Sequence, residues 1–278
     1  MSMALPVGVE LARDVEVGRG GDRRLTMHIL RPSPRPAAAM PVLVWIFGGA
    51  FRMGSKDSGV ERLAPLVPRG YVGACVEYRL SQEATFPAQV QDCKCAIRYL
   101  RAHADELGID PDRIGAWGAS AGGYLVAMLG VTQDVPELEG DGGWADTSSR
   151  VQAVCDFFGP TDFLQMDRAG GEMVHNAPDS PESQLIGGPI QEHPDLVARA
   201  NPITYVRAGA PPFLIVHGDR DPLVPFNQSE LLEAALRRVG ADVRLVKLGG
   251  AGHGGPAFEA PETRQLVGDF FGRHLDRP

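Results

Sequence analysis

The sequence predicts an α/β fold with a mostly parallel central sheet of about eight strands and helices on both faces. Short apolar runs alternate with segments of helical periodicity, which is typical of parallel sheets that are buried on both faces. Four polar or glycine-rich stretches follow such runs, where the carboxyl ends of parallel strands would gather: residues 48–51, 118–122, 217–225 and 249–254. The 278 residues, 44% of them hydrophobic, suffice for one domain that spans 1–278.

Four strands and one long helix are expected in the first part of the chain. Residues 7–17 and 25–30 flank a glycine-rich turn and predict a hairpin that supplies an antiparallel edge. Residues 42–47 form a continuous apolar run, and residues 71–77 are similar, so both predict buried strands. Residues 87–107 predict an amphipathic helix, because apolar side chains recur there at helical spacing between an initial proline and a final glycine.

The second part of the chain continues the alternation. Strands are expected at 113–117, 151–158, 212–217 and 243–248. Helices are expected at 123–129, 227–239 and 260–275. Asn227 with Glu230 three residues later predicts a capping box at the start of one of these helices.

Two segments interrupt this alternation. Residues 131–150 are polar and rich in glycine, and residues 163–212 are rich in proline and glycine without a strong period. A segment as long as the second is rarely a plain loop in a compact domain, and such insertions usually form lids or binding loops. We therefore expect lid or cap insertions near 131–150 and 163–212.

The stretch Gly118-Ala119-Ser120-Ala121-Gly122 lies between a predicted strand and a predicted helix. Strand, Gly-x-Ser-x-Gly and helix form a nucleophile elbow, in which a tight turn pushes the serine hydroxyl out of the sheet edge. Side chains at the two glycine positions would collide with neighbouring backbone. Ser120 is therefore the candidate nucleophile.

A serine nucleophile needs a base, and the base needs an acid that holds its tautomer. Among the seven histidines, only His253 lies downstream in a glycine-rich loop between the last strand and the last helix. For the acid, Asp221 is favoured over Asp219, which is nearer the strand end and suited to capping the turn. Asp162 is a third candidate, better suited to anchoring the insertion that follows it.

An oxyanion hole requires backbone N–H groups that converge on one point. Ala121, directly after the nucleophile, is expected to supply one of them. Gly49 and Ala50, in the loop that follows the strand at 42–47, are expected to supply the others.

Several classes of function and of partner are disfavoured. A net charge of −8 and scattered basic residues argue against nucleic-acid binding. No apolar run approaches the roughly 20 residues of a membrane span, and no secretory signal is visible. Four cysteines in apolar or helical contexts suit a reducing cytoplasm, the expected location. No metal or organic cofactor motif is found, so none is expected, and a homo-oligomer is left open.

Four stretches together resemble the esterase and lipase branch of the α/β-hydrolases, most of all its feruloyl-esterase-like and acetyl-xylan-esterase-like carboxylesterases, which are related to the hormone-sensitive-lipase-like esterases. They are Trp45-Ile46-Phe47-Gly48-Gly49-Ala50-Phe51, Phe86-Pro87-Ala88-Gln89-Val90-Gln91-Asp92, Trp117-Gly118-Ala119-Ser120-Ala121-Gly122-Gly123 and His217-Gly218-Asp219-Arg220-Asp221-Pro222-Leu223-Val224-Pro225. The resemblance implies the α/β-hydrolase fold. It also implies a triad of Ser120, Asp221 and His253 and an oxyanion hole of Gly49, Ala50 and Ala121.

The chain departs from this family pattern at two positions. The family loop usually begins His-Gly-Gly, and Phe47 stands where that histidine would be. A phenyl ring cannot form the hydrogen bonds of an imidazole, so we expect packing to brace the oxyanion loop. Ala119 stands where the hormone-sensitive-lipase group has aspartate, which favours the feruloyl and acetyl-esterase-like branch.

The expected function is hydrolysis of small carboxylic esters with short acyl groups. Expected substrate contacts are Phe51, Phe158 and Leu164, with further walls from Met53, Phe163, Leu185 and Ile186. An amidase of the arylformamidase type, or a peptidase, is an alternative because the same triad serves amide bonds. A non-catalytic binding protein on this scaffold is the remaining alternative.

Overall fold

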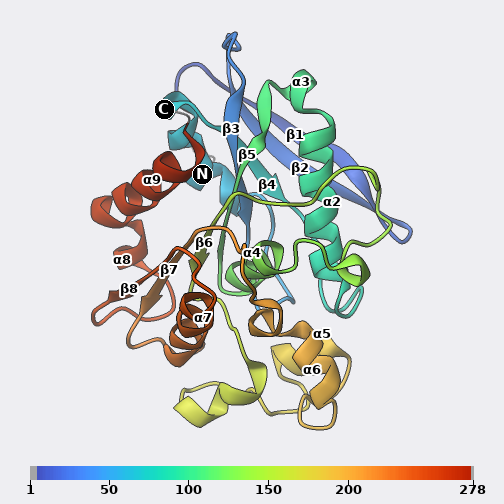
Figure 1. The fold of residues 1–278 in the computed structure, drawn as a ribbon, viewed down its shortest axis with the longest axis vertical. Coiled ribbons are helices and arrows are strands. Elements are labelled where there is room, and N and C mark those ends of the chain that lie inside the picture. Colours follow the sequence, from blue (N-terminus) through green and yellow to red (C-terminus); the bar gives the residue numbers. More distant parts are fainter. Residues whose placement is uncertain (1–4, 277–278) are drawn as a thin grey trace.

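The computed structural model describes residues 5–276, and one eight-stranded sheet runs through it (Figure 1). Its strand order is β1-β2-β4-β3-β5-β6-β7-β8. The strands are β1 (Val9–Gly20), β2 (Arg23–Pro32), β3 (Met40–Ile46), β4 (Val72–Val76), β5 (Ile109–Ala119), β6 (Ala153–Phe157), β7 (Phe213–Gly218) and β8 (Val243–Leu248). The pairings of β1 with β2 and of β2 with β4 are antiparallel, and the other pairings are parallel. The predicted mostly parallel sheet with an antiparallel edge is confirmed.

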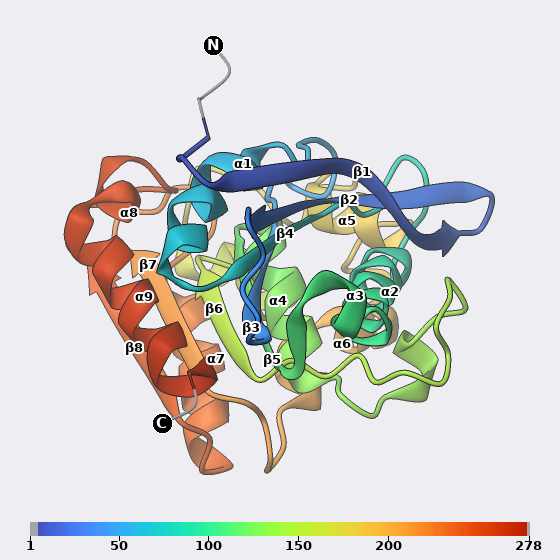
Figure 2. The same ribbon diagram turned by 90° about the horizontal axis from the view of Figure 1, so that it is seen from above.

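Helices cover both faces of this sheet (Figure 2). Successive side chains of β3 point to opposite faces, so Val42, Val44 and Ile46 enter one core and Leu43 and Trp45 the other. The first core packs against α2 (Ala88–Ala102), α4 (Ala121–Val131) and α7 (Asn227–Arg238). The second packs against α1 (Ser58–Leu63), the 3-10 helix η1 (Ala64–Arg69), α8 (Pro256–Glu259) and α9 (Pro261–Leu275).

Two local expectations about helices are wrong. The helix expected at 87–107 ends at Ala102, and after His103 the short helix α3 (Ala104–Leu107) follows. The His103 ring nitrogen Nδ1 lies 2.9 Å from the carbonyl oxygen of Tyr99, so the side chain uses a carbonyl group of the last helical turn. The capping box at Asn227 does not form, because α7 has Phe226 at its N-cap and no side-chain cap.

The insertion at 163–212 has local structure that its sequence did not reveal. It contains α5 (Pro181–Ile186), α6 (Pro194–Ala200) and the 3-10 turns η3 (Phe163–Gln165), η4 (Asp167–Ala169) and η5 (Pro202–Tyr205). Asp162 anchors both ends: its Oδ1 accepts hydrogen bonds from the Leu164 N–H and, at 3.2 Å, from Asn201 Nδ2. Gln228 of α7 holds Asp162 in place, because its side-chain Oε1 accepts a hydrogen bond from the Asp162 N–H at 2.7 Å.

The segment 131–150 lies against β1 and α2. After the last residue of α4, Val131, it contains the 3-10 turn η2 (Pro136–Leu138). Arg98 of α2 donates to the carbonyl oxygens of Glu139 and Gly143, and Trp144 Nε1 donates to Val17 O at 2.8 Å. Among residues 5–276, none of the helices combines the length and the hydrophobicity of a membrane-spanning segment.

Candidate active site

Ser120 lies at the turn between β5 and α4, where the predicted elbow places it. Its backbone is strained, with φ +57° and ψ −122°. A Cβ at Gly118 would collide with the backbone of Gly122, and one at Gly122 would collide with the backbone of Ile46. Only glycine at these two positions permits so tight a turn, which is why the serine side chain stands clear of the sheet edge.

Three side chains from distant parts of the chain meet at this turn. His253 Nε2 lies 2.9 Å from Ser120 Oγ, and His253 Nδ1 lies 2.7 Å from Asp221 Oδ2. A carboxylate accepts only, so Nδ1 carries the proton and Nε2 is left to accept from the serine hydroxyl. The arrangement can therefore pass a proton from Ser120 to His253 while Asp221 holds the imidazole.

Asp221 is held ionised by its surroundings. Its side chain is fully buried, and Oδ1 accepts the N–H groups of Leu223 and Val224 at 2.8 and 2.9 Å. Burial alone would raise the pKa of this carboxyl, but hydrogen bonds from His217 and His253 outweigh it and hold the pKa well below its usual range. The carboxylate is thus available to stabilise an imidazolium.

His217 is a polar neighbour of the triad that sequence reasoning missed. It is fully buried, with Nε2 3.2 Å from Asp221 Oδ2 and 2.9 Å from Val224 O. Both partners are acceptors, so Nε2 donates, and Nδ1 accepts from the Ser229 hydroxyl at 2.7 Å. The signal in the sequence was a histidine four residues before the acid, but its partner Ser229 lies on α7 and only the fold brings it there.

The other two candidate acids have different partners. Asp219 Oδ1 accepts the Gly250 N–H at 2.6 Å, which ties down the loop that carries His253. The Asp162 carboxylate accepts hydrogen bonds from the insertion, among them one from the Leu164 N–H. Of the three aspartates weighed from sequence, Asp221 is the one within hydrogen-bond reach of His253.

The loop after β3 approaches the elbow. Gly49, Ala50 and Ala121 line the same cavity as Ser120, and both Gly49 and Ala50 have positive φ. Phe47 stacks on Tyr78 with ring centroids 4.4 Å apart, and the Tyr78 hydroxyl donates to Phe47 O at 3.0 Å. The loop is therefore braced by packing, as expected, and also by a hydrogen bond to its backbone.

A family model described as BD-FAE matches residues 27–236, well over half of the chain. The chain belongs to the BD-FAE family. This places it among the α/β-hydrolase carboxylesterases, as the four sequence stretches indicated.

Relatives of this BD-FAE chain are esterases. It is 32% identical over 267 residues to Esterase LipQ of Mycobacterium tuberculosis, covering 93% of this chain and 61% of LipQ. It is 33% identical over 247 residues to Esterase LipC of the same organism, covering 88% of this chain and 60% of LipC. The chain thus spans about 60% of the length of these curated relatives.

Solved structures share the fold. A truncated form of a carbohydrate esterase from gut microbiota superposes with TM-score 0.87 at 33% identity, over 96% of this chain and 97% of that one. A thermophilic esterase from Thermogutta terrifontis, Est2, superposes with TM-score 0.77 at 28% identity. The match covers 96% of this chain and 92% of Est2.

The cavity at Ser120 in this BD-FAE chain has a volume of about 310 Å³. Phe51, Met53 and Phe158, three of the residues predicted to contact the substrate or form the pocket wall, line this cavity. Leu164, which was predicted as a substrate contact, is not among the residues that line this cavity and packs against the first core. Phe163, Leu185 and Ile186 are likewise buried in that core.

One polar pair in the cavity wall was not foreseen. His175 and Glu182, both from the insertion, line the cavity and are 2% and 4% exposed. His175 Nδ1 lies 2.9 Å from Glu182 Oε2, and its Nε2 lies 2.9 Å from Leu223 O in the loop that carries Asp221. Burial lowers the pKa of His175, but Glu182 and Leu223 O outweigh it and leave the pKa raised. The pair ties the insertion to the acid loop.

Proposed function

We propose that this chain is a serine carboxylic ester hydrolase that acts on short-chain acyl esters through a covalent acyl-enzyme. The observation that carries the proposal is the continuous contact from Ser120 Oγ to His253 Nε2, at 2.9 Å, and from His253 Nδ1 to Asp221 Oδ2, at 2.7 Å. Membership of a carboxylesterase family supports the same reaction class.

The mechanism follows from which atoms donate and accept. Ser120 Oγ attacks the ester carbonyl carbon while His253 Nε2 takes the hydroxyl proton, and Asp221 stabilises the imidazolium. The N–H groups of Gly49, Ala50 and Ala121 hold the oxyanion. Collapse breaks the bond to the alcohol, which leaves with the proton from His253. Water, deprotonated by His253, then attacks the acyl-enzyme and releases the carboxylic acid and free Ser120.

The short-chain preference rests on the cavity and on relatives. A volume of about 310 Å³ is near the lower end of ligand sites, and Phe51, Met53 and Phe158 make its wall apolar. Structures of the Thermogutta terrifontis esterase 2 carry propionate and butyrate, at 29% and 28% identity to this chain. A small ester is therefore the proposed partner.

A hydrolysis profile tests the proposal. We expect kcat/KM for p-nitrophenyl esters to peak at the acetate to butyrate esters and to fall for the octanoate, because a longer chain outgrows the cavity. Ser120→Ala should lower kcat by about four orders of magnitude or more on each ester. A preference for octanoate would contradict the short-chain claim, and faster turnover of matched anilides would favour an amidase.

A further inference from the structure

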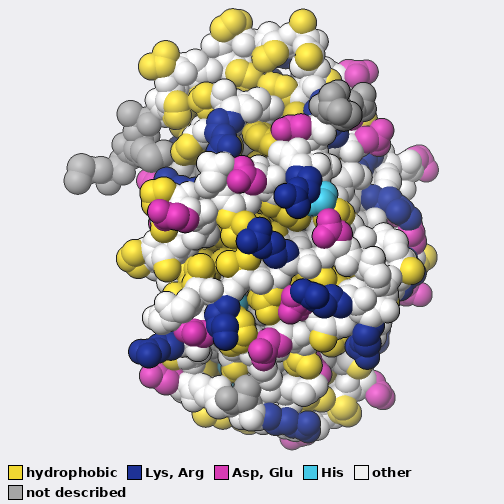
Figure 3. Space-filling view, turned by 60° about the vertical axis from the view of Figure 1, so that its left-hand side comes forward, with side chains coloured by type: hydrophobic (Ala, Val, Ile, Leu, Met, Phe, Trp, Pro, Cys, Tyr) yellow, Lys and Arg dark blue, Asp and Glu magenta, His cyan; other side chains and the backbone are white. Residues whose placement is uncertain are grey.

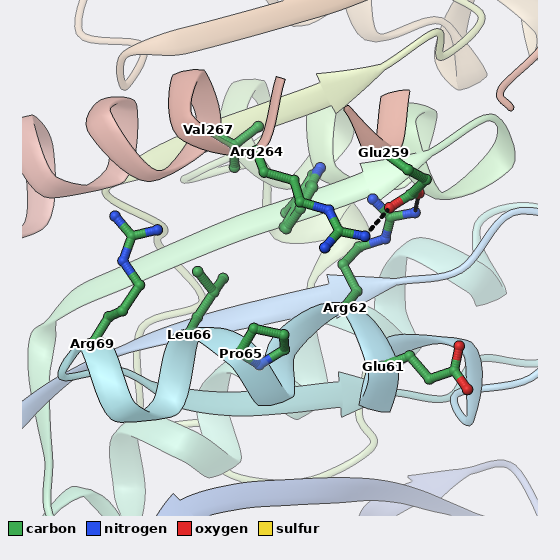
Figure 4. Close-up of a pocket in the computed structure, with 9 residues that line it drawn as sticks. Glu61, Arg62, Pro65, Leu66, Arg69, Glu259, Arg264 and Val267 are labelled. Atoms are coloured by element: carbon green, nitrogen blue, oxygen red, sulfur yellow. Dashed lines mark hydrogen bonds and ion pairs between the residues drawn. The ribbon is translucent and has the colours of Figure 1, made fainter. Parts of the chain in front are cut away.

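A second pocket lies between η1 and α9, on the face of the sheet opposite α2 and α4 (Figure 4). It has a volume of about 200 Å³ and shares no lining residue with the cavity at Ser120. Its side of the molecule carries interspersed basic and acidic side chains around exposed hydrophobic ones (Figure 3). The proposed ester hydrolysis makes no use of this pocket.

The pocket concentrates positive charge in a chain whose net charge is −8. Arg62, Arg69 and Arg264 line it, and both Arg62 and Arg264 pair with Glu259. The Arg69 side chain has no hydrogen bond or ion pair among residues 5–276. In Figure 4 the carboxylate of Glu61 is turned away from the other labelled side chains. Three guanidinium groups and two carboxylates thus line the pocket, and Glu259 pairs with two of the three guanidinium groups.

Arg69 is given room on the α9 side of the pocket. A Cβ at position 268 would lie 2.9 Å from Arg69 Nη2, so Gly268 lets the guanidinium lie against the α9 backbone. Arg69 and Leu66 rise from η1 towards Val267 and Arg264 of α9 (Figure 4). The unpaired cation therefore lies beside an apolar surface, which suits a ligand with an anionic end and an apolar end.

The apolar part of the pocket is aromatic. Trp117 of β5 lines it and is 4% exposed, and the guanidinium carbon of Arg62 lies 4.9 Å from its ring centroid. The buried indole N–H of Trp117 has no acceptor within the described part of the chain. The apolar wall that Trp117 shares with Leu66 and Val267 suits an aromatic ring.

We propose that this pocket binds a small aromatic carboxylate of about the size of benzoate. A cavity of about 150 Å³ holds a benzene ring. A pocket of about 200 Å³ thus leaves space for one ring and a carboxylate. The carboxylate pairs with Arg69, whereas Arg264 keeps its pairing with Glu259, and the ring lies against Trp117 and Leu66. Charge complementarity selects the anion over its neutral amide.

The test uses the three tryptophans as reporters. Benzoate is titrated into the ¹⁵N-labelled full chain, and the indole N–H signals are followed by NMR. The Trp117 signal is the one that persists in both Trp45→Phe and Trp144→Phe. We expect it to move saturably, whereas the Trp144 signal stays still, because Trp144 lies on the far side of the sheet and donates to Val17 O.

Variants and a neutral ligand separate this site from the cavity at Ser120. Arg69→Gln should raise the benzoate Kd about five-fold, and benzamide should bind about ten-fold more weakly than benzoate. Arg238→Gln, at an exposed arginine of α7, is the matched control and should leave Kd unchanged. Leu66→Trp should fill the pocket and abolish the shift. The proposal would be overturned if benzoate did not move the Trp117 signal. It would also be overturned if the benzoate concentration at half-maximal shift were the same in the wild type and in Arg69→Gln.

Discussion

Phe47 shows how one residue can change while the geometry around it is kept. The histidine expected at this position would brace the oxyanion loop through its ring nitrogens, and a phenyl ring has none. Here the ring stacks on Tyr78, whose hydroxyl donates to Phe47 O at 3.0 Å. The hydrogen bond that holds the loop thus comes from Tyr78, which follows β4, and not from the side chain at position 47.

Removing that hydroxyl should loosen the loop. In Tyr78→Phe the stacking stays and the bond to Phe47 O is lost, so we expect about 1 kcal/mol less stability in urea unfolding. We also expect kcat on p-nitrophenyl butyrate to fall about five-fold, because the N–H groups of Gly49 and Ala50 are held less firmly.

Tyr124→Phe is the matched control for this prediction. Tyr124 is equally buried, and its hydroxyl donates to Ala200 O at 2.7 Å, away from the oxyanion loop. We expect Tyr124→Phe to lower the free energy of unfolding by about as much as Tyr78→Phe does and to leave kcat unchanged. An equal loss of kcat in both variants would mean that the Tyr78 bond has no special relation to the loop.

At the residue scale, the sequence was informative where chemistry imposes a local pattern. Ser120 could be proposed because the elbow requires glycine at 118 and 122, and His253 because of its place in a glycine-rich loop. His175 and Glu182 could not be found in this way. Their relation to Leu223 exists only after the insertion folds back over the acid loop.

The strands and the insertion differ in how far sequence could predict them. Strands such as β3 are continuous apolar runs, because both of their faces are buried, and this leaves a plain signal. The helices α5 and α6 are only 6 and 7 residues long, too short for a hydrophobic period to stand out. At α7 the expected cap does not form because the helix already includes Asn227 and has Phe226 at its N-cap.

The insertion is held by a link that depends on pH. The pKa of His175 is raised in the folded chain, so its bonds to Glu182 and Leu223 O stabilise the fold fully below the unfolded pKa of about 6.5. That contribution is lost as the pH rises through the higher folded pKa. His175→Gln should therefore cost about 2 kcal/mol in urea unfolding at pH 6 and clearly less at pH 9.

His193→Gln provides the comparison, since His193 is exposed in the same insertion. It should change stability little at either pH. Because His175 also lines the cavity at Ser120, His175→Gln should raise KM more than it lowers kcat. A stability loss for His175→Gln that is the same at pH 6 and pH 9 would contradict the charged link.

The whole molecule is organised by the order of its strands. β5 occupies the middle of the sheet, and its end carries Ser120, while Trp117, three residues earlier, lines the pocket on the α9 face. The loops after β3, β7 and β8 bring the predicted oxyanion residues, Asp221 and His253 to the same edge of the sheet. The mostly parallel topology could be predicted because alternating strands and helices permit few other arrangements. The pocket between η1 and α9 could not, since nothing in residues 52–70 indicated a helix that packs there.

The central claim is that Ser120, His253 and Asp221 act as one catalytic triad, in which Ser120 is the nucleophile and His253 its base. Its most direct test is the mass of the intact chain, followed by peptide mapping, after reaction with paraoxon, which phosphorylates the Thermogutta terrifontis esterase 2. We predict one diethylphosphoryl group per chain, on Ser120, no label in Ser120→Ala, and labelling slowed by at least about a hundred-fold in His253→Ala. Unchanged mass, or a label on another residue, would contradict the account.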